Sequence, residues 1–389
     1  MNNTYATIFS GAFRPLFLLA GLYAPLVLLL WLGYYFGGLI LPAQRINPFL
    51  WHSHEMVFGF VAAAMGGFVF TAVSNWTGRP PIQGTSLLVL CSLWLLGRIA
   101  MLFLEPGWLA MLLDLTYLFL VIVMLLRELY LGQNRRNYIV AAVFSLLFLF
   151  NVTYHLELSG VLNGIITTSG ASMRGAILSV VIMLALIGGR IIPAFSGNWL
   201  RARAVKGSLP ANFGRLDIAC LLSTVLVLLI FVPYPLTAST GAVLIVTALL
   251  HSLRLARWQT LRIAAEPLLL VLHVAYGWIP IGLLLLAASS FQLVTPSAGI
   301  HALTIGAITT MIMAVAIRAG KGHSGRPLTS DIWINSCFIL ISLAAALRVV
   351  SSFIASNSLI TISALAWLLA FGIFLVVAFP ILVFPPSEH

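Results

Sequence analysis

The sequence carries very little charge. Only 7% of its 389 residues are Asp, Glu, Lys or Arg, whereas roughly a quarter of an ordinary soluble domain is charged. Hydrophobic residues make up 61% of the chain, and a globule of this size would have to place many of them on its surface. The composition therefore excludes a soluble protein and predicts a chain whose solvent is lipid.

Cysteine is scarce, and so are long polar segments. Cys91, Cys220 and Cys337 are far apart, and each lies in an apolar run without CxxC spacing, which argues against disulfide and metal-binding roles. The sequence has no CxxCH motif for haem attachment and no Cys-rich cluster site. No polar segment is long enough for a soluble domain and no internal repeat is evident, so we expect a single transmembrane domain over residues 1–389.

Apolar stretches of about 18 to 25 residues, the length that crosses a bilayer as a helix, are abundant. The expected fold is therefore an all-α polytopic integral membrane protein with about 12 transmembrane helices. The predicted spans are Leu16–Phe36, Pro48–Ser74, Ser86–Leu104, Trp108–Leu126, Tyr138–Leu158, Arg174–Ala194, Leu216–Val232, Leu236–Leu253, Pro267–Ser289, Ser297–Ile317, Ile332–Ile354 and Leu359–Pro380.

The basic residues indicate the orientation of these spans. The net charge is +11, and Lys and Arg gather in every second connection, for example around Arg135 and around Arg203. Because short cytoplasmic loops are enriched in Lys and Arg, both termini are expected in the cytoplasm. Topology thus explains the basic excess, and no nucleic-acid partner is expected.

Histidine is the ionisable residue that stands out. A charged side chain at the membrane centre costs roughly 2.5 to 3.5 kcal/mol, so each ionisable residue in a span is a functional candidate. Eight histidines accompany only nine carboxylates, and neutral imidazole is the commonest metal ligand. The candidate metal ligands are His52, His54, His155, His251, His273, His301 and His323.

The predicted topology sorts these histidines by depth. A span of about 20 residues is about 30 Å long, so histidines at opposite ends of the spans belong to separate centres, and two metal sites are expected. The outer group is His52, His54, His155 and His301, and the inner group is His251, His273 and His323.

The second predicted span has the most distinctive polar residues. Asn47 followed by Pro48 is typical of a helix N-cap with proline in the first turn, and a helix that starts there places His52 and Met56 on one face. His54 then points about 200° away from His52, because each residue turns an α-helix by about 100°. One helix can therefore serve two neighbouring centres, with Met56 either a soft ligand for Cu(I) or a packing residue.

Further polar side chains have more than one interpretation. Glu55 is a proton carrier, a partner to an imidazole or an interfacial carboxylate. His273 and Tyr276 share a helix face, so the phenol donates a proton or binds a small molecule, or the two rings form a packing pair. Arg190 meets a haem propionate or anchors its span at the membrane surface. Glu55 and Tyr276 are our candidate catalytic residues.

Several motifs resemble those of the NnrS family, and together they extend over nearly the whole chain. The most specific are the WHSHEM run that starts at Trp51 and the NWTGRPP run that ends at Pro81. The full set is FRPLF (13–17), WHSHEMVFGF (51–60), FTAVSNWTGRPP (70–81), GGRIIPAF (188–195), RLARW (254–258), LHVAYGW (272–278), HALTIGAI (301–308) and GHSGRP (322–327).

The resemblance implies a bacterial inner-membrane protein of twelve helices that contains haem b and copper and takes part in the response to nitric oxide and nitrosative stress. It does not tell which residue holds which metal, and His155 and His251 fall in less distinctive surroundings. It implies cofactor binding by Arg190, His273, His301 and His323. The residues in matching motifs are His52, His54, Glu55, Met56, Arg190, His273, Tyr276, His301 and His323.

The leading hypothesis is a haem and copper membrane protein that binds or redox-processes nitric oxide, as an oxidoreductase, or relieves its effects. Its expected partners are nitric oxide or a related small molecule, membrane lipid, and an external electron donor such as quinol or a cytochrome. The alternative is a twelve-helix transporter of haem, copper or an anion. A structural or assembly role is the third hypothesis.

Overall fold

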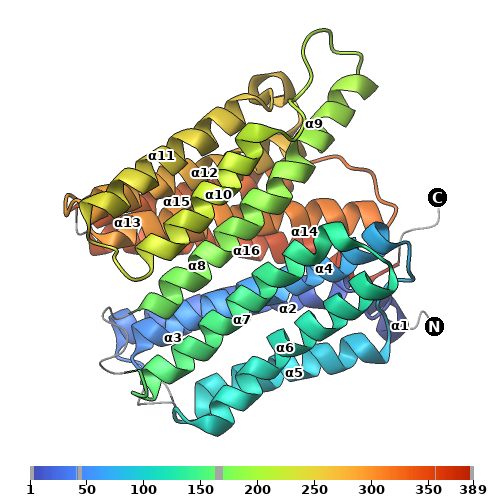
Figure 1. Cartoon of the computed structure of the whole chain (residues 1–389). Coiled ribbons are helices and arrows are strands. Elements are labelled where there is room, and N and C mark those ends of the chain that lie inside the picture. Colours follow the sequence, from blue (N-terminus) through green and yellow to red (C-terminus); the bar gives the residue numbers. More distant parts are fainter. Residues whose placement is uncertain (1–3, 41, 43–45, 163–169, 355, 386–389) are drawn as a thin grey trace. The chain divides into compact units, whose positions relative to one another are not determined.

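The structure, a computed structural model, describes residues 4–40, 42, 46–162, 170–354 and 356–385, and every element in these ranges is a helix (Figure 1). The α-helices are α1 Thr4–Ile8, α2 Phe13–Gly37, α3 Pro48–His54, α4 Ala62–Thr77, α5 Thr85–Phe103, α6 Trp108–Leu131, α7 Tyr138–Leu158, α8 Ala171–Met183, α9 Gly189–Ala202, α10 Arg215–Phe231, α11 Ala238–Ala256, α12 Pro267–Ser290, α13 Pro296–His301, α14 Thr310–His323, α15 Ile332–Ile354 and α16 Asn357–Val383. The π-helical segments η1 Glu55–Val61, η3 Leu184–Gly188 and η5 Ala302–Thr309 join α3 to α4, α8 to α9 and α13 to α14, and η2 Arg135–Asn137 and η4 Thr260–Ile263 are short 3₁₀ helices.

Within the described residues, eleven helices are long and apolar enough to cross a membrane, with each π-helical segment counted as part of its span. They lie at eleven of the twelve predicted positions. The remaining position, Leu216–Val232, is occupied by α10, which has 17 residues. The predicted all-α polytopic architecture is confirmed, and the side of the membrane on which the termini lie stays a prediction.

The second span starts as its sequence predicts. Asn47 Oδ1 accepts a hydrogen bond from the Phe49 amide at 2.9 Å, and a proline occupies the first turn. In the helix that begins there, the side chains of His52 and His54 have different surroundings. The half-buried His52 ring lies 5.0 Å from the Trp31 ring, whereas His54 is fully buried.

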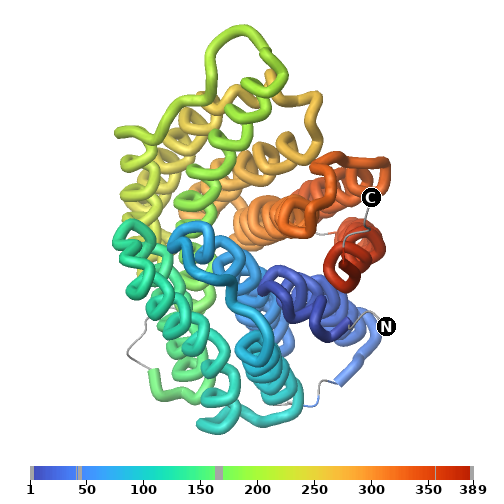
Figure 2. Tube along the Cα trace, turned by 90° about the vertical axis from the view of Figure 1, so that its right-hand side faces the viewer, coloured from blue at the N-terminus to red at the C-terminus, as the bar shows by residue number. Residues whose placement is uncertain are grey.

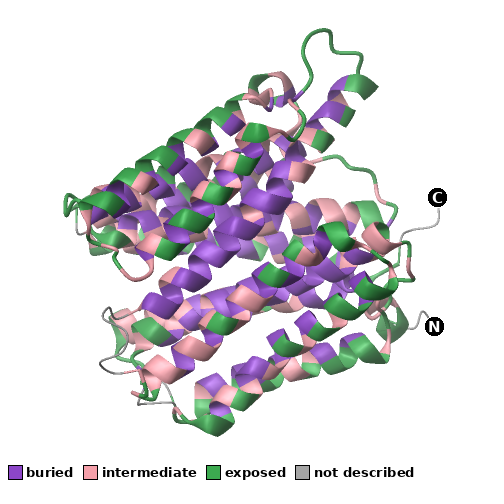
Figure 3. Cartoon of the chain, viewed as in Figure 1, coloured by how far each residue is buried: buried purple, intermediate pink, exposed green. Residues whose placement is uncertain are grey.

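The chain forms two compact units. The first consists of Met1–Ala176, Val315–Pro327 and Phe371–His389, and the second of Ile177–Ala314 and Leu328–Ala370. In both, the described helices bury apolar side chains on the faces that meet and leave many Leu, Ile, Val and Phe side chains exposed on the others (Figure 3). Exposed apolar faces suit a lipid environment.

The structure reveals an internal repeat that inspection of the sequence overlooked. Each π-helical segment interrupts a long span, and its fifth residue is a glycine. Nineteen residues later in every case, the chain turns at a glycine with φ of 68°, 117° or 70°, a conformation that glycine adopts without strain. The pairs of glycines are Gly59 and Gly78, Gly188 and Gly207, and Gly306 and Gly325.

The three cysteines occupy matching places in this repeat. Cys91, Cys220 and Cys337 follow the turn glycines by 13, 13 and 12 residues and lie near the starts of α5, α10 and α15. It is improbable that three cysteines follow a turn glycine at nearly the same distance by chance, when each turn glycine itself follows a π-helical segment. The described chain therefore contains three copies of a unit that begins with an interrupted helix, and each of the first two copies has four long helices.

The first span of the chain completes the third copy. α2 packs against α4 and η1 of the copy that follows it, and its Gly21 lies against Phe374 of α16. α12 packs in the same way against α11 and against α13 and η5 of its following copy. α2 is thus the fourth span of the copy that α16 ends, and Figure 2 shows the end of α16 (red) beside α2 (dark blue).

Candidate functional site

Five buried polar side chains from four spans meet in the first unit. His54 ends α3, Glu55 begins η1, and Arg98, Asp114 and His155 lie on α5, α6 and α7. None is more than 5% exposed. α5 and α6 form a hairpin, and Arg98 and Asp114 each lie about one and a half turns from its connection, which brings them to the same depth. We call these five residues the Asp114 cluster.

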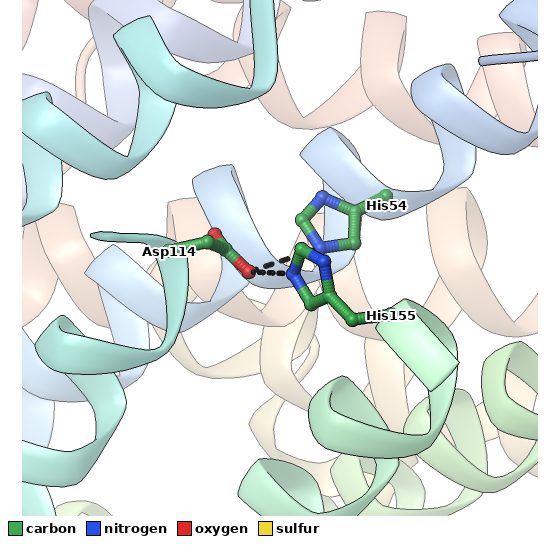
Figure 4. Close-up of side chains that lie close together, drawn as sticks. All are labelled: His54, Asp114 and His155. Carbon is green, nitrogen blue, oxygen red and sulfur yellow. Dashed lines mark hydrogen bonds and ion pairs between the residues drawn. The ribbon is translucent and has the colours of Figure 1, made fainter. Parts of the chain in front are cut away.

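The carboxylate of Asp114 is the centre of this cluster. Its Oδ2 accepts a hydrogen bond from His155 Nε2 at 2.9 Å and lies 3.2 Å from His54 Nε2 (Figure 4). Asn151 Nδ2 donates to the same oxygen at 2.8 Å, and Arg98 donates to Oδ1. The two histidine nitrogens and Oδ2 all lie within 4.8 Å of one another. Ligand atoms around a tetrahedral metal with bonds of about 2.0 Å are about 3.3 Å apart, so this spacing fits a metal site.

Glu55 holds the imidazole of His54 in place. His54 Nδ1 donates to Glu55 Oε1 at 2.7 Å, and Glu55 also accepts hydrogen bonds from Arg98 Nη1, at 2.7 and 2.8 Å, and from the Tyr23 hydroxyl. A carboxylate on the far nitrogen is the usual partner of a metal-binding histidine. His54 therefore presents Nε2 as its ligand atom.

The surroundings of His54 Nε2 require a positive charge. This nitrogen faces two oxygens, Asp114 Oδ2 at 3.2 Å and Asn151 Oδ1 at 3.0 Å. Both oxygens are acceptors, so a proton or a metal ion must lie between them and the nitrogen. The two carboxylates of the cluster also exceed its one guanidinium, which favours a further bound cation.

Two buried polar atoms, one within the cluster and one next to it, have no hydrogen-bond partner among the described residues. They are Arg98 Nε and the hydroxyl oxygen of Tyr154, and the Tyr154 ring lies 4.4 Å from the His54 ring. Unpaired buried polar groups are rare and mark places where water, an ion or a ligand binds. The cluster thus has the donor set for a metal and nearby groups for a small ligand.

The other predicted site residues of the first unit lie outside this cluster. His52 packs on a tryptophan ring, as described above, and Met56 is half-buried in η1. His323 ends α14, and its ring lies 5.8 Å from an aromatic ring of α2. Of the predicted metal ligands, the first unit brings together His54 and His155.

The second unit holds another buried charged network, centred on Arg254, which is fully buried. Its Nε donates to Asp217 Oδ1 at 2.7 Å, and its Nη1 donates to the Ala185 carbonyl at 2.7 Å and to the Tyr276 hydroxyl at 3.0 Å. Ala185 belongs to η3, where the π-helical turn redirects carbonyl groups from their usual partners. Arg254 therefore stabilises the interruption of this span.

The hydrogen bonds around His251 have a defined direction. Arg254 can only donate, so the Tyr276 hydroxyl accepts from it and donates to His251 Nδ1 at 2.7 Å. The Thr224 hydroxyl donates to the Cys220 carbonyl at 2.6 Å, and it accepts from His251 Nε2 at 2.9 Å. Both nitrogens of His251 are thus engaged by side chains.

The remaining predicted residues of the second unit lie apart from this network. His273 Nε2 is 2.9 Å from the Ser196 hydroxyl, and its Nδ1 is 2.8 Å from the Thr260 hydroxyl. Arg190 is half-buried near the start of α9. His301 Nδ1 donates at 2.8 Å to the backbone carbonyl four residues before it.

The two adjacent glycines at the end of η3 provide a test of the Arg254 network. A Cβ atom on Gly189 would overlap the Arg254 guanidinium, whereas a Cβ on Gly188 would meet its nearest side-chain atom at an ordinary 3.5 Å. We expect Gly189→Ala to destabilise the fold by about 1–3 kcal/mol, as overpacking does. Thermal unfolding in detergent measures the effect, with Gly188→Ala as the matched control. Equal midpoints for the two variants would contradict this account.

The sequence reasoning missed the charged partners because it followed the histidines alone. Arg98 and Asp114 lie in neighbouring predicted spans on either side of one short connection. Opposite charges within membrane spans are expected to pair. The similar distances of Arg98 and Asp114 from the connection could therefore have identified these residues as a pair. Asp217 and Arg254 carry a similar signal, since each lies near the cytoplasmic end of its predicted span.

Comparisons with known proteins show the family of this chain. No curated protein matches the sequence. Residues 7–385 match the family described as NnrS protein, which is nearly the full length. The match agrees with the motifs noted in the sequence, and it indicates a membrane protein related to nitric oxide. The chain belongs to the NnrS family.

Proposed function

We propose that this protein contains copper and haem, resides in the bacterial inner membrane, and binds or redox-processes nitric oxide, or relieves its effects, during nitrosative stress. The family match supports a role related to nitric oxide. The observation that carries the metal part of the proposal is the buried set of His54, Asp114 and His155, whose ligand atoms lie within 4.8 Å of one another.

In this proposal the copper ligands are His54 Nε2, His155 Nε2 and Asp114 Oδ2, a donor set in which imidazole suits copper. Copper held by these residues would supply one-electron redox chemistry. Glu55 fixes the orientation of His54 through Nδ1, and the Tyr154 hydroxyl is a donor for a small ligand near the cluster.

The haem that the family resemblance implies does not fit the buried histidines of the second unit as they are placed. His251 bonds to two hydroxyl groups, and so does His273. An axial ligand needs one ring nitrogen for iron, and either residue would have to give up a hydrogen bond to provide it. We therefore assign the haem no ligand among them.

The proposal predicts which substitutions remove copper. The full chain is purified in detergent, and its copper and haem are measured by metal analysis and by the Soret absorption band. His54→Ala, His155→Ala and Asp114→Asn should each lose bound copper, because each removes one of three ligands. Glu55→Gln should keep the ligands and lower copper affinity by about 10- to 100-fold.

His52→Ala is the matched control, because His52 lies on the same helix and packs on Trp31. It should retain copper. If His52→Ala loses as much copper as His54→Ala while both variants stay folded, the copper site is elsewhere. A wild-type protein that holds neither copper nor haem, even when both are supplied during expression, would refute the proposed function.

The alternative function is a transporter of haem, copper or an anion, and the internal repeat favours it. Many transporter folds are built from repeated units with sites in interrupted helices, and each of the three copies here has one interrupted span. Uptake of copper into proteoliposomes without redox turnover would support this alternative over the first.

A further inference from the structure

The repeat makes Arg326 the counterpart of Arg79. Each arginine directly follows the turn glycine of its copy and precedes a proline. A hydroxyl residue, Thr77 or Ser324, stands before the glycine, and its hydroxyl donates to the carbonyl four residues earlier, at 2.7 Å and 2.6 Å. The two arginines therefore follow equivalent turns at the end of an interrupted span.

In the first copy the arginine has a carboxylate partner. Glu128 lies near the end of α6, the third long helix of this copy. One of its carboxylate oxygens accepts from Arg79 Nε, and the other accepts from Arg127 Nη1 at 2.9 Å. A single carboxylate thus lies between two guanidinium groups.

In the third copy two guanidinium groups meet again, at the end of its third long helix, α16. Arg326 and Arg14 both donate to the Ile381 carbonyl, at 3.4 and 3.1 Å. Each also bonds to two further carbonyls at or just after this helix end, at 3.0 to 3.3 Å. All of these residues belong to the first unit.

The negative charge that the first copy supplies is missing here. Neither Arg14 nor Arg326 forms an ion pair with a carboxylate of the described residues, and the charge of Arg326 acts unfavourably on Arg14. The C-terminal end of a helix carries about half a negative charge. More than one positive charge therefore remains uncompensated at the place where the first copy has Glu128.

Arg14 also leaves one edge of its guanidinium unused. The residue is 5% exposed, and its Nε has no hydrogen-bond partner among the described residues. Its three bonds to carbonyls all come from Nη1, so the edge formed by Nε and Nη2 contributes none of them. Such an edge can bind two oxygens of a carboxylate or phosphate side by side. A buried donor without a partner is rare and marks a place where an ion or ligand binds.

We propose that Arg14 and Arg326 form a binding site for a phosphate group at the end of α16. The phosphate offers two oxygens to the unused edge of Arg14 and another to Arg326, and its negative charge takes the place of the Glu128 carboxylate. Two sources share this chemistry, inorganic phosphate and the phosphodiester of an anionic membrane lipid. The proposal is independent of the copper site.

The test uses the full chain purified in detergent, freed of lipid and kept in phosphate-free buffer. Binding of inorganic phosphate is measured by calorimetry, and binding of phosphatidylglycerol by native mass spectrometry with phosphatidylcholine for comparison. Arg14→Lys keeps the charge and loses the two-donor edge, and Arg326→Gln removes one charge. Each should weaken binding of the same ligand by about tenfold or more, the value of one hydrogen bond to a charged group.

Arg79→Gln is the matched control, because Arg79 occupies the equivalent turn of the first copy and has Glu128 as its partner. It should leave binding of both ligands unchanged. Arg326→Gln keeps all three carbonyl bonds of Arg14, so it tests the site even if Arg14→Lys does not fold. Glu388→Gln, which removes the last acidic side chain of the sequence, should bind as wild type does.

The outcomes separate the two sources. Saturable phosphate binding that Arg14→Lys and Arg326→Gln both weaken identifies a free anion, and selective loss of phosphatidylglycerol identifies a lipid. If neither ligand depends on Arg14 or Arg326 more than on Arg79, the proposal is wrong. It is also wrong if a ligand binds to Glu388→Gln and not to wild type, because a carboxylate of the chain then occupies the site.

Discussion

Arg254→Met is expected to prevent stable folding of the second unit. The substitution leaves the carboxylate of Asp217 buried without the cation that it bonds at 2.7 Å, and it removes the donor to the Ala185 carbonyl in η3. Breaking a buried ion pair by removing one partner costs about 3–5 kcal/mol. The amount of monodisperse protein extracted from membranes and its thermal midpoint measure the loss.

The double variant Arg254→Met with Asp217→Asn is the control for this prediction. It removes both charges together, so much of the stability should return, although the bond to η3 stays lost. If the double variant is less stable than Arg254→Met alone, the buried charge of Asp217 is not what destabilises the single variant.

Arg98→Met should make the first unit depend on a metal ion for its stability. Without the guanidinium, Glu55 and Asp114 remain buried beside His54, at a cost of about 3–5 kcal/mol. A divalent cation can replace the missing charge between Asp114, His54 and His155. At a free metal concentration of a hundred times the dissociation constant, binding stabilises the folded protein by about 2.7 kcal/mol.

The measurement is the thermal midpoint of Arg98→Met and of wild type, each with a chelator and with added Cu²⁺ or Zn²⁺. The variant should gain more from the metal than wild type does, and adding Asp114→Asn should abolish the gain. An equal response of wild type and Arg98→Met would show that the ion does not bind beside Arg98.

The spans were predictable because their cause is local. A helix that crosses lipid must form all its backbone hydrogen bonds internally along an apolar stretch. The length of that stretch can be read directly from the sequence. The predicted second span, Pro48–Ser74, begins where the helix begins, and the Asn47 cap is present as expected.

The interruptions of the spans were not predictable because their cause is tertiary. The carbonyl groups that a π-helical turn redirects need donors from other helices. Trp94 Nε1 donates to the Gly59 carbonyl at 3.0 Å in η1, and Arg254 donates to Ala185 in η3. Such donors lie on neighbouring spans. Hydropathy indicates where a span lies in the sequence but not how the helix is rotated about its axis, so it does not predict which side chains face the π-helical turn.

The candidate site was predictable in depth but not in composition. The order of the spans along the chain was enough to predict that His54 and His155 lie at the same end of their helices. The third ligand, Asp114, comes from another helix, and its orientation depends on how α5 and α6 pack. The same limit explains His52, which the sequence grouped with His54 and which the structure places against Trp31.

The assignment of α2 to the third copy means that the order of the long helices along the chain differs from their order in the repeat. Arg14 at the start of α2 donates to the carbonyls of Ile381 and Leu382 at the end of α16, at 3.1 and 3.0 Å. A short linker could therefore join the end of α16 to the start of α2. A gene rearranged to begin at the largely exposed connection before Pro296 would encode α13 to α16 and α2 in succession, so that each copy became one continuous stretch of polypeptide without a cut through any helix.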